Sequence, residues 1–157
     1  MGCNSLITQE NIALDDVLTH NFAMKTHTEL IKVRFGETDA AGVVYHANYF
    51  PYLEDARTRM LDSMGIPYKT LVGMGYHLPI VEAHIRYRAS AFFDDLLEVT
   101  AKALPMEGSR VIIEYTIKRD GLLLTEAKTT LAFVNTKGFP VKPPKEFVEK
   151  FNAAIKK

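Results

Sequence analysis

An aspartate and a histidine lie seven residues apart in the segment Arg34-Phe-Gly-Glu-Thr-Asp-Ala-Ala-Gly-Val-Val-Tyr-His46. The carboxylate of Asp39 has the chemistry of a nucleophile for an acyl carbon or of a general base for water. Gly42 lies between the two residues and permits a tight turn, because glycine adopts positive φ without strain. We therefore expect Asp39 to fold back toward His46.

A long amphipathic helix is expected to position these residues, running from about His46 to about Met64. One face of it is apolar at helical spacing: Tyr49, Leu53, Ala56 and Met60. Pro51 fits only near the start, where the first N–H groups have no partner within the helix. Those N–H groups and the positive end of the helix dipole favour a developing negative charge nearby. The start of this helix is therefore suited to stabilise an oxyanion.

The rest of the chain is typical of an antiparallel sheet. From Thr28, the side chains of Ile31, Val33 and Phe35 alternate with charged residues, which predicts a first strand. Gly65 and Pro67 end the helix, and a short helical turn follows over 68–72. Four further extended runs are expected over 77–88, 96–104, 109–119 and 122–135, and a C-terminal helix over 144–155. Asp120-Gly121 predicts a two-residue hairpin. The sum is an α+β fold of about five strands with one central helix.

The length of 157 residues and the 47% hydrophobic content predict one globular domain. We place it at residues 28–157, after an N-terminal extension over 1–27. In that extension a short amphipathic helix is indicated by helical spacing: Leu14, Val17, Leu18 and Phe22.

Charge and cysteine content narrow the class of protein. Lys plus Arg and Asp plus Glu both total 19, so no net positive field attracts nucleic acid. Cys3 is the single cysteine, which excludes an internal disulfide and a Cys-rich zinc site and favours a reducing cytoplasm. No run of 18 apolar residues is present, so no transmembrane segment is expected.

The segments Thr38-Asp-Ala-Ala-Gly-Val-Val-Tyr-His-Ala-Asn-Tyr49 and Leu53-Glu-Asp-Ala-Arg57 resemble the 4-hydroxybenzoyl-CoA thioesterase-like family of the hot-dog fold. They are most similar to the short acyl-CoA thioesterases associated with the bacterial Tol-Pal system. A weaker similarity covers Tyr87 to Val99, and the whole resemblance spans about residues 28 to 150. It implies a sheet wrapped around the central helix, and two subunits with their sheets side by side in a homodimer or homotetramer. It also implies hydrolysis of acyl-CoA to a free acid and CoA, with no metal or other cofactor.

The resemblance also assigns roles to particular residues. Asp39 is expected to be the catalytic carboxylate, and the backbone N–H of His46 the oxyanion donor, with its imidazole as a secondary aid. An Asp before a helix more often caps the helix or forms a turn, so that simpler role stays open. Tyr45 and Tyr49 are expected to form pocket wall or core. The turn at Ser109 and Arg110 resembles the place where related enzymes contact the nucleotide part of CoA.

Other functions remain compatible with this pattern. An acyl carrier protein could replace CoA as the acyl donor, and a hot-dog domain could bind acyl-CoA without catalysis. A regulator would need a DNA-binding module, for which residues 1–28 are too short and too weakly basic. A dehydratase shares the fold, but the segment 38–42 resembles the thioesterase pattern more closely. The acyl group, the aryl or aliphatic preference and the oligomeric state are not specified by the sequence.

Overall fold

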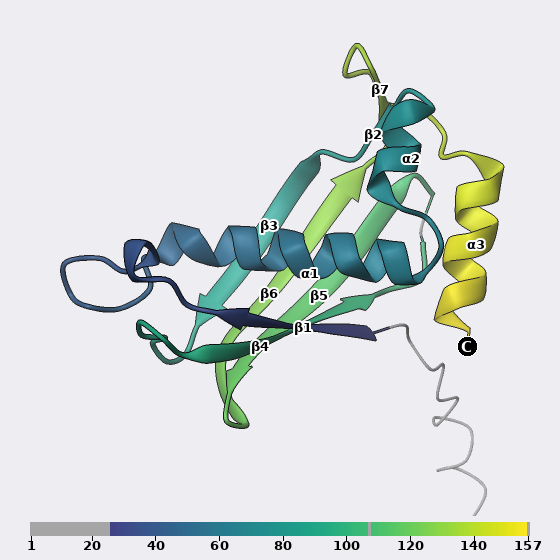
Figure 1. Cartoon of the computed structure of the whole chain (residues 1–157). Coiled ribbons are helices and arrows are strands. Elements are labelled where there is room, and N and C mark those ends of the chain that lie inside the picture. Colours follow the sequence, from purple (N-terminus) through teal and green to yellow (C-terminus); the bar gives the residue numbers. More distant parts are fainter. Residues whose placement is uncertain (1–25, 107, 157) are drawn as a thin grey trace, which may run out of the picture.

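The computed structural model describes residues 26–106 and 108–156, in which an antiparallel sheet curves around a long helix (Figure 1). The sheet has five strands in the order β1 (Thr26–Lys32), β4 (Leu96–Ala103), β5 (Arg110–Arg119), β6 (Leu122–Ala132) and β3 (Ile80–Tyr87). A small pair is formed by β2 (Tyr76–His77) and β7 (Val134–Asn135). The helices are α1 (Tyr49–Ser63), α2 (Tyr68–Gly73) and α3 (Lys145–Ile155), and two 3-10 turns are η1 (Phe35–Glu37) and η2 (His46–Asn48). The predicted α+β arrangement is confirmed.

Helix α1 buries the face that its sequence predicts. Its apolar residues at helical spacing are all at most 3% exposed: Tyr49, Leu53, Ala56 and Met60. Pro51 is the third residue of the helix, where it removes no hydrogen bond that the helix could have made. The 3-10 turn η2 precedes it, so the helical stretch begins at His46 as expected.

The turns and strand bounds of the sheet largely agree with the local signals in the sequence. Asp120 and Gly121 have φ values of 49° and 79°, the left-handed pair that a two-residue hairpin requires. The expected run over 77–88 is divided into β2 and β3 at Leu78 and Pro79, and the run over 122–135 is divided into β6 and β7. The predicted helices over 68–72 and 144–155 correspond to α2 and α3.

The prediction that Phe35 continues the first strand is wrong. Strand β1 ends at Lys32, and Val33 is buried, but Phe35 lies in η1 with 75% of its surface exposed. The chain turns here because the carboxylate of Glu37 accepts a hydrogen bond of 2.8 Å from the backbone N–H of Arg34. Side-chain alternation therefore stops two residues earlier than the sequence suggested.

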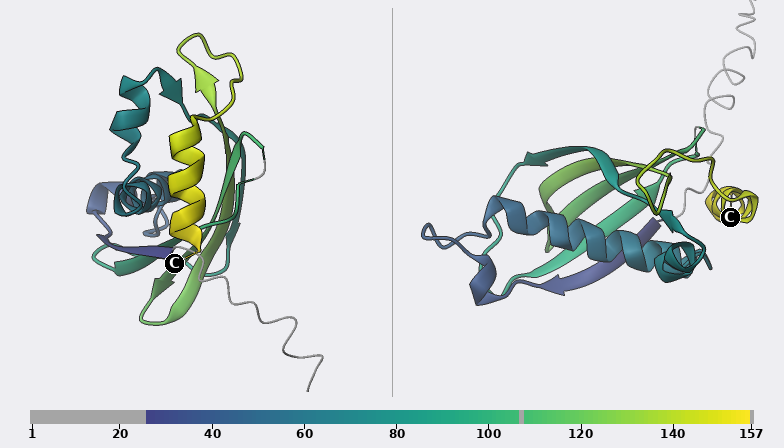
Figure 2. Two further views of the ribbon diagram at one scale, coloured as in Figure 1. Left: turned by 90° about the vertical axis from the view of Figure 1, so that its right-hand side faces the viewer. Right: turned by 90° about the horizontal axis from the view of Figure 1, so that it is seen from above.

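The two edges of the sheet are covered differently. Helix α1 packs chiefly against β1 and β4, and the views of Figure 2 show it on one side of the curved sheet. Strand β3 forms the opposite edge and pairs only with β6. Three of its large apolar side chains are between 42% and 56% exposed: Ile80, Val81 and Tyr87. Among the described residues this edge is therefore open, and it exposes large apolar side chains as well as polar ones.

Helix α3 closes the end of the sheet beside α2. Its inner side chains Phe147, Phe151 and Ile155 are buried, and the ring of Phe147 lies 4.9 Å from that of Phe133. No helix in the described ranges is long and apolar enough to cross a membrane. The helix expected over 14–22 lies outside the described residues.

Candidate active site

Asp39 lies at the tip of a tight hairpin formed by residues 37–45, which we call the Asp39 hairpin. The N–H of Asp39 donates to the carbonyl of Val43, and the N–H of Gly42 donates to the carbonyl of Asp39, both at 2.9 Å. Gly42 has a φ of 76°, the positive value that was expected to permit a tight turn here. At the base, the N–H of Tyr45 donates to the carbonyl of Glu37 at 2.9 Å. Asp39 therefore lies on one arm of the hairpin, and His46 directly follows the other arm.

The carboxylate of Asp39 is exposed and lightly bonded. Its Oδ1 accepts the N–H of Ala41 at 2.8 Å, the local bond of an Asx turn. The turn-forming role that the sequence left open is thus present. It engages one carboxylate oxygen and leaves the group accessible at the surface of the hairpin.

His46 opens the η2 turn at the start of the α1 helix. As the first residue of η2, it has no acceptor for its N–H within the turn, and no backbone acceptor is found for it elsewhere in 26–106 and 108–156. Its carbonyl accepts the hydroxyl of Tyr87 at 2.8 Å, and its exposed ring lies 4.3 Å from that of Tyr45. A free N–H at a helix start is the donor that an oxyanion needs.

A second loop anchors the far arm of the Asp39 hairpin to the sheet. The N–H of Val44 donates to the carbonyl of Ala91 at 2.9 Å, and Val43 forms a bridge with Phe92. Asp95 accepts the N–H of Phe92 and pairs with Arg119, whose guanidinium lies 5.5 Å from the ring of Phe92. The loop before β4 is therefore fixed to the end of β5, and the hairpin is fixed to that loop.

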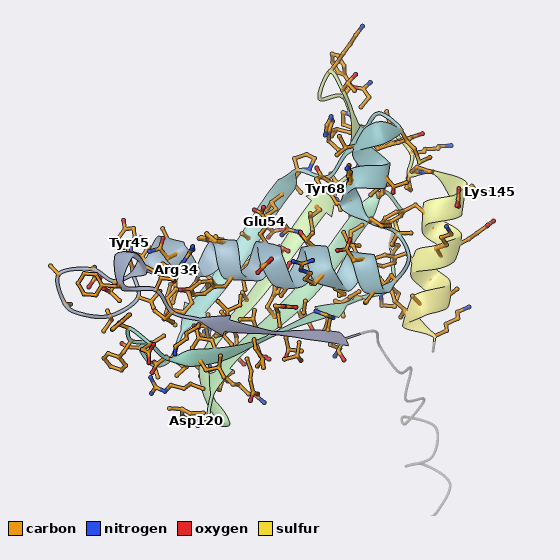
Figure 3. The ribbon with its side chains drawn as sticks, viewed as in Figure 1. Arg34, Tyr45, Glu54, Tyr68, Asp120 and Lys145 are labelled. Carbon is orange, nitrogen blue, oxygen red and sulfur yellow. The ribbon has the colours of Figure 1, made fainter. Side chains whose placement is uncertain are left out.

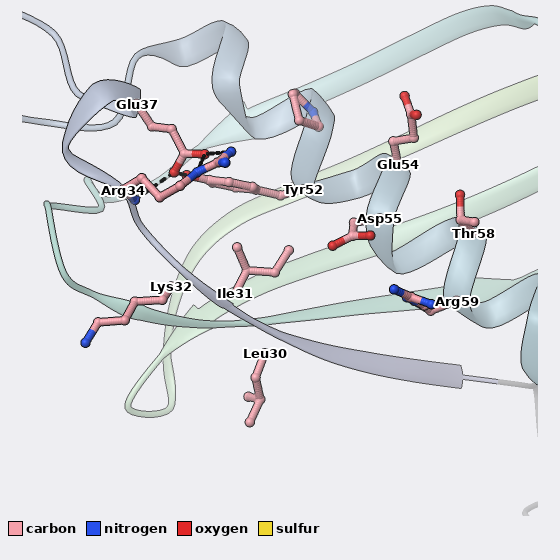
Figure 4. A pocket seen from close by; sticks show the side chains of 11 residues that line it. Leu30, Ile31, Lys32, Arg34, Glu37, Tyr52, Glu54, Asp55, Thr58 and Arg59 are labelled. Carbon is pink, nitrogen blue, oxygen red and sulfur yellow. Dashed lines mark hydrogen bonds and ion pairs between the residues drawn. The ribbon is translucent and has the colours of Figure 1, made fainter.

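Glu37 is the buried carboxylate of this region, at 9% exposure. Figure 4 shows it at one end of a groove of about 850 Å³ between β1 and α1, bonded to Arg34 and Tyr52. Burial alone would raise the pKa of Glu37, but hydrogen bonds from Tyr52 and Arg34 outweigh it and lower that pKa. Burial and the bond to Glu37 raise the pKa of Tyr52, so its phenol stays protonated.

The two expected tyrosines differ in their surroundings. Tyr49 is 3% exposed, its ring lies 5.2 Å from that of Tyr87, and burial raises its pKa. Tyr45 is 45% exposed and lies at the same end of the molecule as Arg34 (Figure 3). Tyr49 is therefore part of the core beneath the site, and Tyr45 is placed at its surface.

Ser109 and Arg110 lie at the opposite end of β5 from the Asp39 hairpin. Arg119, at the far end of that strand, contacts the loop that holds the hairpin. Nine residue steps of an antiparallel strand span about 30 Å. Within one chain, Asp39, Tyr45 and His46 therefore lie in or next to the Asp39 hairpin and Tyr49 lies at the start of α1, whereas Ser109 and Arg110 lie at the other end of β5.

Two residues of this region were not identified from the sequence. Glu37 stood in the quoted motif, but a glutamate in a loop is usually a solvated charge. Tyr87 stood at the end of an expected strand, with no local signal that its hydroxyl meets a turn 41 residues away. Both depend on partners that only the folded chain brings close.

Known proteins are similar to this chain over most of its length. A family model described as the thioesterase-like superfamily matches residues 33–151. The chain belongs to the thioesterase-like superfamily. Its similarity to a protein of Haemophilus influenzae named acyl-CoA thioesterase YbgC is 34% identity over 124 residues, which covers 78% of this chain and 91% of that protein.

Solved structures share the fold of this chain. A protein of Thermus thermophilus described as hypothetical, TT1821, superposes with a TM-score of 0.78 at 30% identity, covering 82% of this chain and 98% of that one. The 4-hydroxybenzoyl CoA thioesterase of Pseudomonas sp. strain CBS-3 has a TM-score of 0.73 at 22% identity, covering 80% and 99%. The hot-dog fold expected from the sequence is confirmed. The residues matched by the superfamily include the whole Asp39 hairpin and α1.

Proposed function

We infer that this protein hydrolyses an acyl-CoA thioester to a free carboxylic acid and CoA. The match to the thioesterase-like superfamily and the similarity to a YbgC acyl-CoA thioesterase support this reaction. The observation that carries it is the exposed carboxylate of Asp39 in a tight hairpin that leads directly into His46, whose N–H has no backbone acceptor in 26–106 and 108–156.

The proposed chemistry follows from these two groups. A thioester carbonyl gains negative charge on oxygen when its carbon is attacked. The N–H of His46 donates to that oxygen, supported by the positive end of α1. The imidazole of His46, exposed beside Tyr45, is a secondary aid to substrate or water.

Asp39 acts in one of two ways. As a nucleophile, its carboxylate attacks the acyl carbon, the CoA thiolate leaves, and water then hydrolyses the mixed anhydride. As a general base, it takes a proton from water, the hydroxide attacks the acyl carbon, and the leaving thiolate takes up the proton. The two routes give the same products and differ in the covalent intermediate.

The reaction is tested with a panel of aryl and aliphatic acyl-CoAs, measured by thiol release. We expect hydrolysis by the parent protein and its loss in Asp39→Asn, which keeps the shape of the side chain and removes the charge. No hydrolysis by the parent would refute the reaction, and near-full activity of Asp39→Asn on the best substrate would refute the role of Asp39. The same panel offered on acyl carrier protein separates the two donors.

Acid-quenched protein then separates the two routes. An adduct with the mass of the acyl group, present in the parent protein and absent from Asp39→Asn, supports the nucleophilic route. A parent protein without an adduct during rapid turnover supports the general-base route.

We further propose a homodimer in which β3 pairs with β3 of a second copy. This dimer is either the complete assembly or one half of a homotetramer. The exposed apolar side chains of this edge support it, since an open edge strand is a template for pairing. Val81→Lys should then produce a monomer in light scattering. Leu30→Lys on the opposite edge is the matched control, because Leu30 is similarly exposed at 61%. A strictly monomeric parent would contradict the proposal.

The dimer gives a place to the CoA contact expected at Ser109 and Arg110. Because Ser109 and Arg110 are remote from Asp39 in one chain, we propose that they contact the nucleotide part of CoA bound mainly to a second copy. Arg110→Gln should raise KM for acyl-CoA and leave kcat unchanged. We also propose a cytoplasmic location, which the single cysteine supports and fractionation of cells would test.

A further inference from the structure

We propose that Glu37 is a positioning residue that holds the oxyanion donor at His46 in its working orientation. This inference rests on the proposed roles of Asp39 and His46. It assigns to a buried carboxylate two residues from Asp39 a function distinct from acid–base chemistry. Three observations carry it: the partners of its carboxylate, the partners of its main chain, and the turn to which they lead.

The carboxylate of Glu37 is fixed by four hydrogen bonds. Its Oε1 accepts the Nε and a terminal nitrogen of Arg34 at 2.9 and 2.6 Å. Its Oε2 accepts the backbone N–H of Arg34 at 2.8 Å and the hydroxyl of Tyr52 at 2.7 Å. Tyr52 is a buried residue of α1, at 3% exposure. One side chain therefore joins the end of β1 to the first turns of α1.

The main chain of Glu37 is fixed to the residues that flank His46. Its carbonyl accepts the N–H of Tyr45 at 2.9 Å and the side-chain amide of Asn48 at 2.7 Å. Tyr45 and Asn48 are the residues just before and at the end of η2. Because the peptide between Tyr45 and His46 carries the proposed donor N–H, its orientation follows the position of Glu37.

The same contacts argue against a direct chemical role for Glu37. Both carboxylate oxygens are already occupied by donors, and the side chain is only 12% exposed. A carboxylate satisfied in this way is a poor base, since taking up a proton would break bonds to Arg34 and Tyr52. Its influence on the reaction must therefore pass through the groups that it holds.

A misplaced oxyanion donor affects the transition state more than substrate binding. The charge on the carbonyl oxygen is small in the bound thioester and large during attack, so the N–H gains strength only then. Small displacements in an active site reduce rates by up to about a hundredfold. Loosening Glu37 should consequently lower kcat and change KM little.

Glu37→Gln is the sharpest variant, because it preserves the size of the side chain. Its amide nitrogen must face at least one donor, either the guanidinium of Arg34 or the backbone N–H of Arg34. We expect kcat to fall about 10- to 100-fold and KM to stay within about threefold. Glu146→Gln, which breaks the exposed pair with Lys150 on α3, is the matched control and should keep the parent kcat.

Two further variants keep the test valid if Glu37→Gln folds poorly. Tyr52→Phe removes one donor and leaves the charge, and should lower kcat in the same direction but less. Glu37→Asp keeps the charge on a shorter arm, and should recover part of the kcat lost in Glu37→Gln. An unchanged kcat in well-folded Glu37→Gln and Tyr52→Phe would overturn the proposal.

Amide hydrogen exchange provides a readout independent of turnover. In Glu37→Gln, exchange should rise at Tyr45 and in η2 but not in β5 or β6, and equal protection in parent and variant would overturn the inference. Asp39→Asn, assayed alongside, separates the two levels of inference. If Asp39→Asn is inactive and Glu37→Gln is fully active, the positioning role fails and the proposed function stands. If Asp39→Asn is active, the proposed role of Asp39 fails, and if the parent protein hydrolyses no acyl-CoA, the proposed function itself fails.

Discussion

The tip and the base of the Asp39 hairpin each carry a carboxylate, in opposite surroundings. Asp39 at the tip is exposed and accepts one local N–H. Glu37 at the base is buried and accepts four hydrogen bonds from Arg34 and Tyr52. A group that must meet substrate needs free lone pairs, whereas a group that must hold a loop needs them occupied. Two similar acids two residues apart are thus suited to separate tasks.

Removal of the charge at the tip should have the largest effect, and only on activity. Asp39→Asn should lower kcat by about 10²- to 10⁴-fold, the usual contribution of a positioned acid or base. Its free energy of unfolding should stay within about 0.5 kcal/mol of the parent, as for other exposed substitutions. Thiol release and urea unfolding on the same preparation measure both. A large loss of stability would contradict the division between tip and base.

Truncation of the side chain at the base of the hairpin should lower the free energy of unfolding, which substitution at the tip should leave almost unchanged. Glu37→Ala leaves Tyr52 and the backbone N–H of Arg34 without acceptors, and should reduce the free energy of unfolding by about 1–3 kcal/mol. Asp39→Ala is the matched variant and should change it by less than about 0.5 kcal/mol. Urea midpoints of the two proteins give the comparison directly. Equal midpoints would show that the buried carboxylate of Glu37 contributes nothing to the free energy of unfolding.

The pH dependence of stability should include a contribution from Glu37 at the base of the hairpin. The folded state lowers the pKa of Glu37, so its stabilisation is complete above the ordinary carboxyl pKa of about 4.3 and is lost as pH falls through the lower folded pKa. The difference in unfolding free energy between the parent and Glu37→Gln should therefore be constant near neutral pH and shrink in acid. Urea midpoints measured across this range would show a pH-independent difference if the idea were wrong.

The smallest effect on kcat should come from Tyr87, the residue of β3 that bonds to the η2 turn. Tyr87→Phe removes the hydroxyl that donates to the carbonyl of His46 and retains the ring packed against Tyr49. A neutral hydrogen bond contributes about 0.5–1.5 kcal/mol, so kcat should fall no more than about tenfold. A change equal to that of Glu37→Gln would mean that β3, and not the base of the hairpin, controls the turn.

Local signals in the sequence predicted most of the fold. The apolar spacing of α1, the tolerance for Pro51 and the Asp120-Gly121 turn depend on residues within a few positions of one another. The structure has all three as expected. The tight turn at Gly42 belongs to the same class. Such features require only backbone preferences and periodic burial, which one sequence expresses directly.

Long-range partners account for what the sequence did not predict. Glu37, whose bond back to Arg34 turns Phe35 out of the strand, is buried only because Tyr52 lies against it from fifteen residues away. Ser109 was grouped with the site by resemblance alone. It lies far from Asp39 because the other end of β5, at Arg119, contacts the loop that holds the hairpin. None of these relations is a property of neighbouring residues.

The strand order has a consequence for synthesis of the protein on the ribosome. Strand β1 pairs with β4, from Thr26 with Lys102 to Lys32 with Leu96, and β3 pairs with β6. Both outer strands are thus translated before the inner strands that receive them, and closing such distant pairs is slow. The Asp39 hairpin is made well before its anchors at Ala91 and Phe92. We expect a nascent chain to gain its active site only when most of the sheet has left the ribosome.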